Sequence, residues 1–134
     1  GVTLQGPKVL RSVDVDMNAM TDVVPSLAIA ALFAKGTTTL RRIAHMQYKE
    51  CRRIDVLCSE LQKTGAVISK IDGGLSIQGQ VSLTAARCET YRDHRMAMAF
   101  SILGTQIPGL EVVNPACVKK TFPSFYETLL ACVP

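Results

Sequence analysis

The sequence predicts an α/β (α+β) protein, a single domain built from repeated β-α-β-α-β-β units. Three observations support this fold class. Ala, Leu, Val and Ile dominate the hydrophobic residues, which make up 48% of the chain, while aromatic residues make up only 5%. Short alternating or β-branched stretches take turns with longer apolar stretches of helical period. After about residue 80, the same order of strand and helix starts again.

The first unit is predicted to span residues 12–80. "SVDVDM" alternates apolar and polar side chains, which predicts a strand. Thr21 or Asp22 can cap the helix that follows, and Gly36 ends it. "TTTLRRI" is rich in β-branched residues and predicts a second strand. A second helix is expected from about Lys49, and "AVISKI" and "LSIQG", joined by a turn, close the unit as a hairpin. The apolar face of the second helix would consist of Ile54, Leu57, Cys58 and Leu61.

The second unit is predicted to span residues 84–134 and to be incomplete. "ARCETY" predicts a strand, and Asp93 opens a helix. "GLEVV" predicts the next strand, and a last helix, "PSFYETLLACV", begins at Pro123. No hairpin follows, and the chain opens at Gly1 rather than Met, so we expect a fragment or a processed piece. The buried side of the first of these helices would consist of Met96, Ala97, Phe100 and Leu103.

An acidic residue and a lysine recur at the same spacing in the two units. Asp22 and Lys49 are 27 residues apart, and so are Asp93 and Lys120. Helix, turn, strand and loop lie between the members of each pair, which favours an internal repeat. If the helices pack in parallel, their starts face one side of the molecule, and that side attracts an anionic ligand.

The composition argues against several classes of protein. No run of 18 apolar residues is present, so we expect no membrane span. The 5 cysteines are odd in number and form no C-x-x-C pair, which disfavours a disulfide framework and a zinc site. We expect reduced thiols in a cytosol-like compartment and no bound metal. Cys51 stands between charges, but no base partner for a catalytic thiol is evident.

Charged residues gather directly in front of an apolar helix in "TYRDHRMAMAFSIL". Asp93 can cap this helix, but a cap does not require Arg95, and a cation in the first helical turn opposes the helix dipole. A bound anion would reverse that penalty, because Arg95 and the free backbone N–H groups would both point at it. A solvated helix start is the alternative. His94 either orients a neighbour or acts as a base.

A second charged group, "KECRR", begins another predicted helix. On that helix Lys49 and Arg53 would share a face, and Glu50 would neighbour Arg53. Glu50 is then either half of a surface ion pair or a proton carrier whose charge state the cations set. Asp22 is either a plain helix cap or a base for a substrate hydroxyl. Lys120 is either an ordinary surface lysine or a ligand for an anion.

These charged motifs resemble those of a known family. "DMNAMTD", "KGTTTL", "KECRRI", "DHRMAMAFSIL" and "CVKKTFPSFYETL" are similar, in the same order, to motifs in the C-terminal third of 5-enolpyruvylshikimate-3-phosphate synthases. The resemblance covers about Val13 to Leu129. "MTD" and "KEC" are also similar to forms found in pentafunctional arom-type enzymes, so a multifunctional parent chain is one interpretation.

The resemblance implies an inside-out barrel made of such units, and it implies a reaction. Family members transfer the enolpyruvyl group of phosphoenolpyruvate to the 5-hydroxyl of shikimate 3-phosphate, in chorismate and aromatic amino acid biosynthesis, and release phosphate. They use no metal or organic cofactor and act in the cytoplasm, or in the plastid of plants. The whole enzyme is much longer, and its missing remainder would be a necessary partner. We expect the chain alone to be inactive, because half of a cleft cannot exclude water.

The resemblance also implies roles for individual residues. Asp22 would hold and deprotonate the substrate hydroxyl, and Glu50 would carry a proton at the phosphoenolpyruvate methylene. Lys49 would contact shikimate 3-phosphate. The other residues at substrate-binding positions are Arg53, Arg95 and Lys120, which would clamp phosphoenolpyruvate, together with Asp93, His94 and His45.

Four positions depart from the family pattern. His45 and Gln47 stand where Asn and Arg are expected. Arg52 replaces a usual Asp, Asn or Glu, and Arg92 replaces a usual Asp or Asn. The two arginines add positive charge beside the predicted site, which either tightens anion binding or marks a diverged protein.

Three other functions stay open at this point. The chain is alternatively a non-catalytic module that binds an anion or a protein, or a relative of the enolpyruvyl transferases that act on UDP-sugars. RNA 3′-phosphate cyclases contain similar repeats, but the scarcity of aromatic residues for base stacking disfavours a nucleic-acid partner. "DHRMA" favours the shikimate enzyme over these alternatives.

Overall fold

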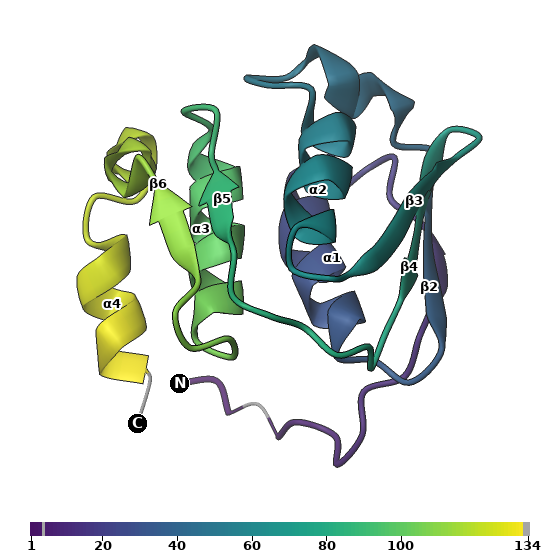
Figure 1. The fold of residues 1–134 in the computed structure, drawn as a ribbon, viewed down its shortest axis with the longest axis horizontal. Coiled ribbons are helices and arrows are strands. Elements are labelled where there is room, and N and C mark those ends of the chain that lie inside the picture. The colour runs from purple at the N-terminus through teal and green to yellow at the C-terminus, as the bar shows by residue number, and fades with distance from the viewer. Residues whose placement is uncertain (4, 133–134) are drawn as a thin grey trace.

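The computed structural model describes residues 1–3 and 5–132, and its elements fall into two groups along the chain (Figure 1). The first group consists of β1 (Asp14–Asp16), α1 (Val24–Leu32), β2 (Thr37–Arg41), α2 (Arg53–Gln62), β3 (Val67–Ile71) and β4 (Gly74–Gln78). The second group consists of β5 (Arg87–Glu89), α3 (His94–Gly104), β6 (Glu111–Val113) and α4 (Phe125–Cys132). Short 3₁₀ helices precede α1, α2 and α4, namely η1 (Thr21–Val23), η2 (Ala44–Tyr48) and η3 (Pro115–Lys120).

The direction of the strands places the helix starts at one end of the molecule. The first sheet has the order β1-β2-β4-β3, with β1 parallel to β2 and with β4 antiparallel to both β2 and β3. β1, β2 and β3 therefore point the same way, and β5 and β6 form a separate parallel pair. A helix that connects parallel strands starts beyond the carboxyl end of the first strand. Accordingly α1, α2 and α3 all begin at the upper end of Figure 1.

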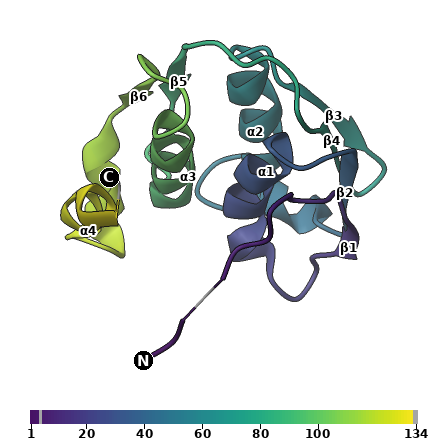
Figure 2. The same ribbon diagram turned by 90° about the horizontal axis from the view of Figure 1, so that it is seen from below.

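The helices form the centre of the fold. α1 and α2 lie between the β1–β4 sheet and α3, and α4 lies beyond α3, on the side away from α1 (Figures 1 and 2). α1 is apolar nearly all round, as expected of a helix with neighbours on several sides. The largest fully buried apolar side chains come from these helices, from the β1–β4 sheet and from the segment after β2: Phe100, Leu32, Leu40, Ile43, Met46, Leu57, Leu61, Leu75, Ile77, Met96 and Leu103.

The element order, the helix faces and the hairpin predicted from the sequence are confirmed. The four apolar residues predicted for the face of α2 are all buried, and so are the four predicted for α3. β3 and β4 form the antiparallel hairpin, with Ile71 opposite Gly74. Helical periodicity and an Asp-Gly turn are local signals, so they can be recognised without knowledge of the rest of the chain.

The predicted starts of three helices are wrong. The first helix opens as η1, α1 itself begins at Val24, and no side chain caps either. α2 begins at Arg53 rather than about Lys49, because η2 and a turn occupy the preceding residues. α4 begins at Phe125 rather than Pro123, and Val133, the end of its predicted range, lies outside the described residues. In the first case, the Asp22 carboxylate bonds to cations of α2 and α3 instead of to the backbone of its own helix start.

Gly79 marks a close approach between the end of β4 and the end of α1. A Cβ atom at this position would overlap the carbonyl oxygen of Ala34 and lie 2.6 Å from that of Ala31. The Gly79 N–H donates to the carbonyl of Gly36 at 2.9 Å, which holds the two segments together. The glycine is therefore required by space rather than by an unusual backbone angle.

We predict that Gly79→Ala lowers the free energy of unfolding by about 1–3 kcal/mol, because the backbone segments must move apart. Urea unfolding followed by circular dichroism measures this difference. Gly73→Asn is the matched control, because the hairpin turn at Gly73 (φ 63°) is open and asparagine tolerates that conformation. Equal stability of Gly79→Ala and the wild type would contradict the packing described here.

Candidate functional site

Three helix starts bring their charged side chains to one place. Asp22 lies in η1 before α1, Arg53 is the first residue of α2, and Asp93 is the N-cap of α3. The predicted cap at Asp93 is confirmed, because its Oδ1 accepts the backbone N–H of Arg95 at 2.9 Å. The cap predicted at Asp22 is wrong, since that carboxylate bonds to cations from other helices.

Arg53 is the central residue of this site. Its side chain is 1% exposed and its guanidinium reaches three carboxylates. Nε donates to Asp93 at 2.8 Å, Nη1 to Asp22 at 3.0 Å, and Nη2 to Glu50 at 2.7 Å. Asp93 is itself fully buried. A buried charge is tolerated only when it is paired and hydrogen-bonded, and Arg53 meets that condition on every nitrogen.

Three further cations lie around this centre. Arg95 contacts Asp22 at 2.9 Å, and Lys49 lies 3.8 Å from the same carboxylate. Lys120, at the end of η3, contacts Glu50 at 2.9 Å. The side chains of these cations are 34%, 36% and 58% exposed, respectively. They can therefore reach a ligand in solvent, whereas Arg53 is enclosed.

We call these seven side chains the ionic cluster. Its four cations and three carboxylates carry a net formal charge of +1. The sequence predicted that Lys49 and Arg53 share a helix face, which is wrong because Lys49 precedes α2. Both still reach Asp22. The members are Asp22, Lys49, Glu50, Arg53, Asp93, Arg95 and Lys120.

The cluster keeps its two more exposed acids ionised. The hydrogen bond from Lys120, helped by the charge of Arg53, lowers the pKa of Glu50 to about 2. Partial burial raises the pKa of Asp22, but the hydrogen bond from Arg53 and the charges of Arg95 and Lys49 outweigh it, so that pKa lies below its usual value. Neither carboxylate holds a proton at neutral pH while its cations stay in place.

His94 and Cys51 pack against the cluster without joining its ion pairs. His94 is 3% exposed, and burial lowers the pKa of its imidazole, so the ring is neutral at pH 7. Its Nδ1 has no hydrogen-bond partner among the described residues. The Cys51 thiol donates to Asp93 at 3.4 Å, and burial raises its pKa to about 12. No local pattern in the sequence indicates this contact, because its two residues are far apart in the chain.

His45, the remaining predicted site residue, is not brought into the cluster. It lies exposed in η2, and it takes part in none of the ion pairs or side-chain hydrogen bonds found among the described residues. Gln47 and Arg52, which also depart from the family pattern, both bind Asp55. Gln47 donates to it at 2.9 Å and Arg52 at 2.7 Å. The positive charge that Arg52 adds is therefore compensated locally.

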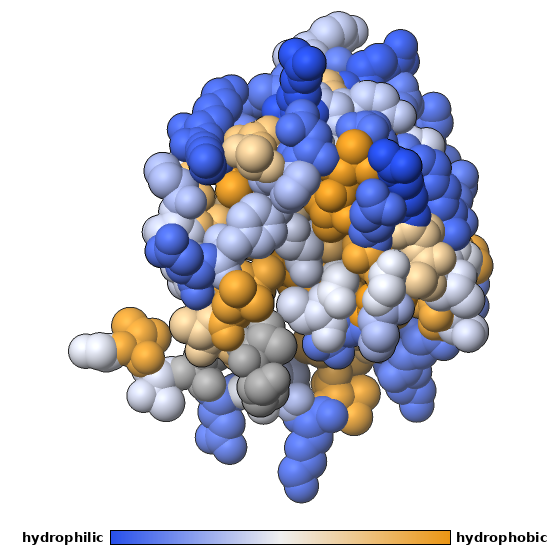
Figure 3. Space-filling view, turned by 60° about the vertical axis from the view of Figure 1, so that its left-hand side comes forward, coloured by the Kyte–Doolittle hydropathy of each residue, from blue (hydrophilic) through white to orange (hydrophobic). Residues whose placement is uncertain are grey.

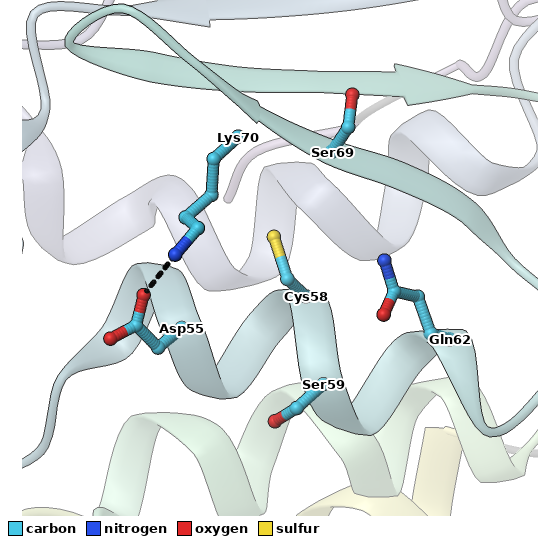
Figure 4. Close-up of a pocket in the computed structure, with 6 residues that line it drawn as sticks. All are labelled: Asp55, Cys58, Ser59, Gln62, Ser69 and Lys70. Atoms are coloured by element: carbon cyan, nitrogen blue, oxygen red, sulfur yellow. Dashed lines mark hydrogen bonds and ion pairs between the residues drawn. The ribbon is translucent and has the colours of Figure 1, made fainter.

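One hollow of the surface touches the ionic cluster at Glu50, and its lining also includes Cys51, Arg52, Asp55, Val56, Ser59 and Tyr91. An open pocket between α2 and β3 is lined by Asp55, Cys58, Ser59, Gln62, Ser69 and Lys70 (Figure 4). It contains one ion pair, between Asp55 and Lys70 at 2.9 Å, and none of the predicted site residues. Figure 3 shows that the upper end of the molecule, where the helices begin, is mainly hydrophilic.

The described residues show neither a metal centre nor a membrane helix. Within residues 1–3 and 5–132, no three His, Cys, Asp or Glu side chains are grouped so that they could hold a metal ion. Of the helices formed by these residues, none has the length and the apolar character needed to cross a membrane.

Comparison with known proteins gives consistent matches. Residues 2–129 match the family model of EPSP synthase (3-phosphoshikimate 1-carboxyvinyltransferase). The chain is 41% identical to the 3-phosphoshikimate 1-carboxyvinyltransferase of Nostoc punctiforme over 90% of its length, and 42% identical to the chloroplastic enzyme of Solanum lycopersicum over 96%. It covers only 28% and 26%, respectively, of those two proteins.

A solved structure agrees with the sequence matches. EPSP synthase from Acinetobacter baumannii superposes with a TM-score of 0.86 and 28% sequence identity, over 92% of this chain and 30% of that one. The ordered set of motifs, the fold and the family match all lead to one conclusion. The chain belongs to the EPSP synthase family and corresponds to a little over a quarter of the relatives it matches.

Proposed function

We propose that the chain forms the phosphoenolpyruvate-binding part of an enzyme that transfers the enolpyruvyl group to the 5-hydroxyl of shikimate 3-phosphate. The observation that carries this proposal is the ionic cluster. Arg53, Arg95 and Lys120 come from α2, α3 and η3, yet they belong to one connected set of ion pairs. A small acid with a phosphate and a carboxylate needs such convergent cations.

The geometry suits a small anion better than a long polymer. Arg95 offers a planar fork that matches a carboxylate or a phosphate, and Lys120 offers a compact charge. Arg53 is fully occupied, so a ligand meets its Nη2 only after Glu50 moves aside. We propose that the anion takes the place of Glu50 on Lys120 and Arg53.

This exchange would give the two acids their chemical roles. Once an anion holds Lys120 and Arg53, Glu50 loses the partners that lower its pKa and can carry a proton to and from the methylene carbon. Asp22 gains basicity in the same way when Arg95 and Lys49 turn to the substrates, and it accepts the proton of the 5-hydroxyl. Addition and elimination then proceed through a tetrahedral intermediate, and the cations hold the departing phosphate.

The rest of the enzyme is a necessary partner in this proposal. Because the chain spans 28% of the Nostoc punctiforme relative, we propose that further polypeptide supplies most contacts to shikimate 3-phosphate and excludes water. The chain alone would bind an anion without catalysing the transfer. The relative from Solanum lycopersicum is named as chloroplastic, and we propose the cytoplasm, or the plastid in a plant, as the compartment.

We predict that the chain binds phosphoenolpyruvate and that Arg95→Ala and Lys120→Ala each weaken binding by about tenfold or more, because each removes a charged hydrogen bond. Isothermal titration calorimetry measures the affinity, with and without shikimate 3-phosphate. Arg87→Ala is the matched control, because Arg87 is exposed and pairs with Glu111 in β6. Equal losses in all three variants would contradict the site.

We predict that a chimera regains the complete reaction. Residues 2–129 replace the matched segment of the Nostoc punctiforme protein, and phosphate release from the two substrates is measured. Asp22→Asn and Glu50→Gln should each lower kcat by about 10²–10⁴-fold, as expected for a positioned base or acid. Full turnover in both variants would refute their roles. A folded chimera that binds phosphoenolpyruvate but releases no phosphate would favour the non-catalytic binding module.

We predict that the contribution of Glu50 to the free energy of unfolding depends on pH. Because folding lowers its pKa from 4.5 to about 2, the stabilisation is complete above pH 4.5 and is lost as the pH falls toward 2. Glu50→Gln should therefore be less stable than the wild type by about 1 kcal/mol at pH 7, and the two should converge only as the pH approaches 2. Urea unfolding at several pH values tests this, with Glu127→Gln on exposed α4 as the control. A difference that does not change with pH would contradict the ion pairs of Glu50.

A further inference from the structure

Glu60 is a buried carboxylate that lies outside the ionic cluster. Its side chain is 1% exposed and reaches β5 of the second group of elements. Lys63 contacts it at 2.5 Å, and the backbone N–H of Glu89 donates to it at 2.8 Å. The Tyr91 hydroxyl lies 3.4 Å from its other oxygen. On α2 itself, the Ser59 hydroxyl also lies 3.4 Å from that oxygen. The contacts of this carboxylate outside α2 and Lys63 lead to one short segment, residues 89–91.

A buried carboxylate in this position needs an explanation. Charged groups in a protein interior are costly, and an apolar side chain of similar size often stabilises a fold equally well. Glu60 is flanked on α2 by the buried Leu57 and Leu61, so an apolar residue would fit the helix pattern. What Glu60 offers instead is an acceptor for the N–H of Glu89 and for the phenol of Tyr91.

The segment that Glu60 holds contains an unusual turn. Tyr91 and Arg92 both adopt left-handed conformations, with φ values of 52° and 59°. Two successive side chains in this region are unfavourable, and such a conformation persists only where its surroundings impose it. The N–H of Asp93 closes the turn on the carbonyl of Thr90 at 2.9 Å, and Thr90 is fully buried.

Asp93, which follows this turn, carries the geometry of the ionic cluster. It holds Arg53 at 2.8 Å and caps the helix that presents Arg95. Arg53 and Glu60 are seven residues apart on α2, two turns of helix, so they lie on the same face. α2 therefore contacts the segment of residues 89–93 at two points. Glu60 contacts Glu89 and Tyr91, and Arg53 contacts Asp93.

We propose that Glu60 is a positioning residue, which fixes the turn of residues 89–93 so that Asp93 holds Arg53 and Arg95 in place for the anionic substrate. The anion-binding part of this inference rests on the proposed function, whereas the effect on Arg53 does not. The substrate class is unchanged, namely a small phosphorylated acid. Glu60 itself contacts no substrate.

The test uses the Nε–H resonance of Arg53 in proton–nitrogen NMR spectra of the chain without ligand. In the wild type, this buried proton donates to Asp93 and should give a separate, slowly exchanging signal. Glu60→Ala should shift the signal or broaden it beyond detection. Glu60→Gln keeps an acceptor for Glu89 and should retain it. Ile68→Ala, in a buried position of β3, is the control that lowers stability without touching the turn.

A second measurement follows phosphoenolpyruvate binding by calorimetry. Glu60→Ala should weaken binding by about tenfold, the scale expected when the support of a charged site is loosened, while Glu60→Gln and Ile68→Ala should stay close to the wild type. If the wild-type chain fails to bind phosphoenolpyruvate, the proposed function fails, and the Arg53 signal still decides the role of Glu60.

The inference is overturned if Glu60→Ala leaves the Arg53 signal unchanged, or if Ile68→Ala disturbs it equally. If Glu60→Ala does not fold, Tyr91→Phe decides, because it removes only the hydroxyl and leaves the exposed ring in place. A shifted Arg53 signal in Tyr91→Phe supports the inference, and an unchanged signal overturns it.

Discussion

The contact between Arg53 and Asp93 is the interaction on which the rest of the structure depends. Both side chains are almost completely buried, and they join the start of α2 to the start of α3. The two groups of elements belong to separate sheets, so this pair fixes one group against the other at the end where the helices begin. Removing one partner of such a pair leaves an uncompensated buried charge, which costs about 3–5 kcal/mol. Stability and the geometry of the site are therefore linked at one point.

The same arrangement explains how several cations remain close together without a ligand. Lys49, Arg53 and Arg95 share the carboxylate of Asp22, and Glu50 lies between Arg53 and Lys120. The acids screen the repulsion between the cations and keep their side chains near their final positions. In the proposed function, an incoming anion would exchange one set of charged contacts for another, so the site would need little reorganisation.

Local patterns in the sequence predicted most of the fold but only part of the site. The buried faces of α2 and α3, the β3–β4 hairpin and the cap at Asp93 follow from periodicity, turn residues and capping preferences, which act over a few residues. The start of α2 was missed because the side chains of Lys49 and Glu50 bond to Asp22 and Lys120, and no short-range pattern records those partners. The only local signal for Glu60 is a charged residue on an apolar helix face. Its role cannot be inferred from that signal alone, because its partners lie in a turn about 30 residues further along the chain.

The shared direction of β1, β2 and β3 has a consequence for how this kind of site can arise. Every strand–helix–strand step delivers a new helix start to the same edge, whatever the sequence of the helix. Duplication of such a step therefore adds another pair of charged side chains beside the existing ones, while the opposite edge, where Gly79 packs against α1, is free to keep its contacts. A charged surface of this type can therefore be extended by duplication of a strand–helix–strand unit, and no new fold is required.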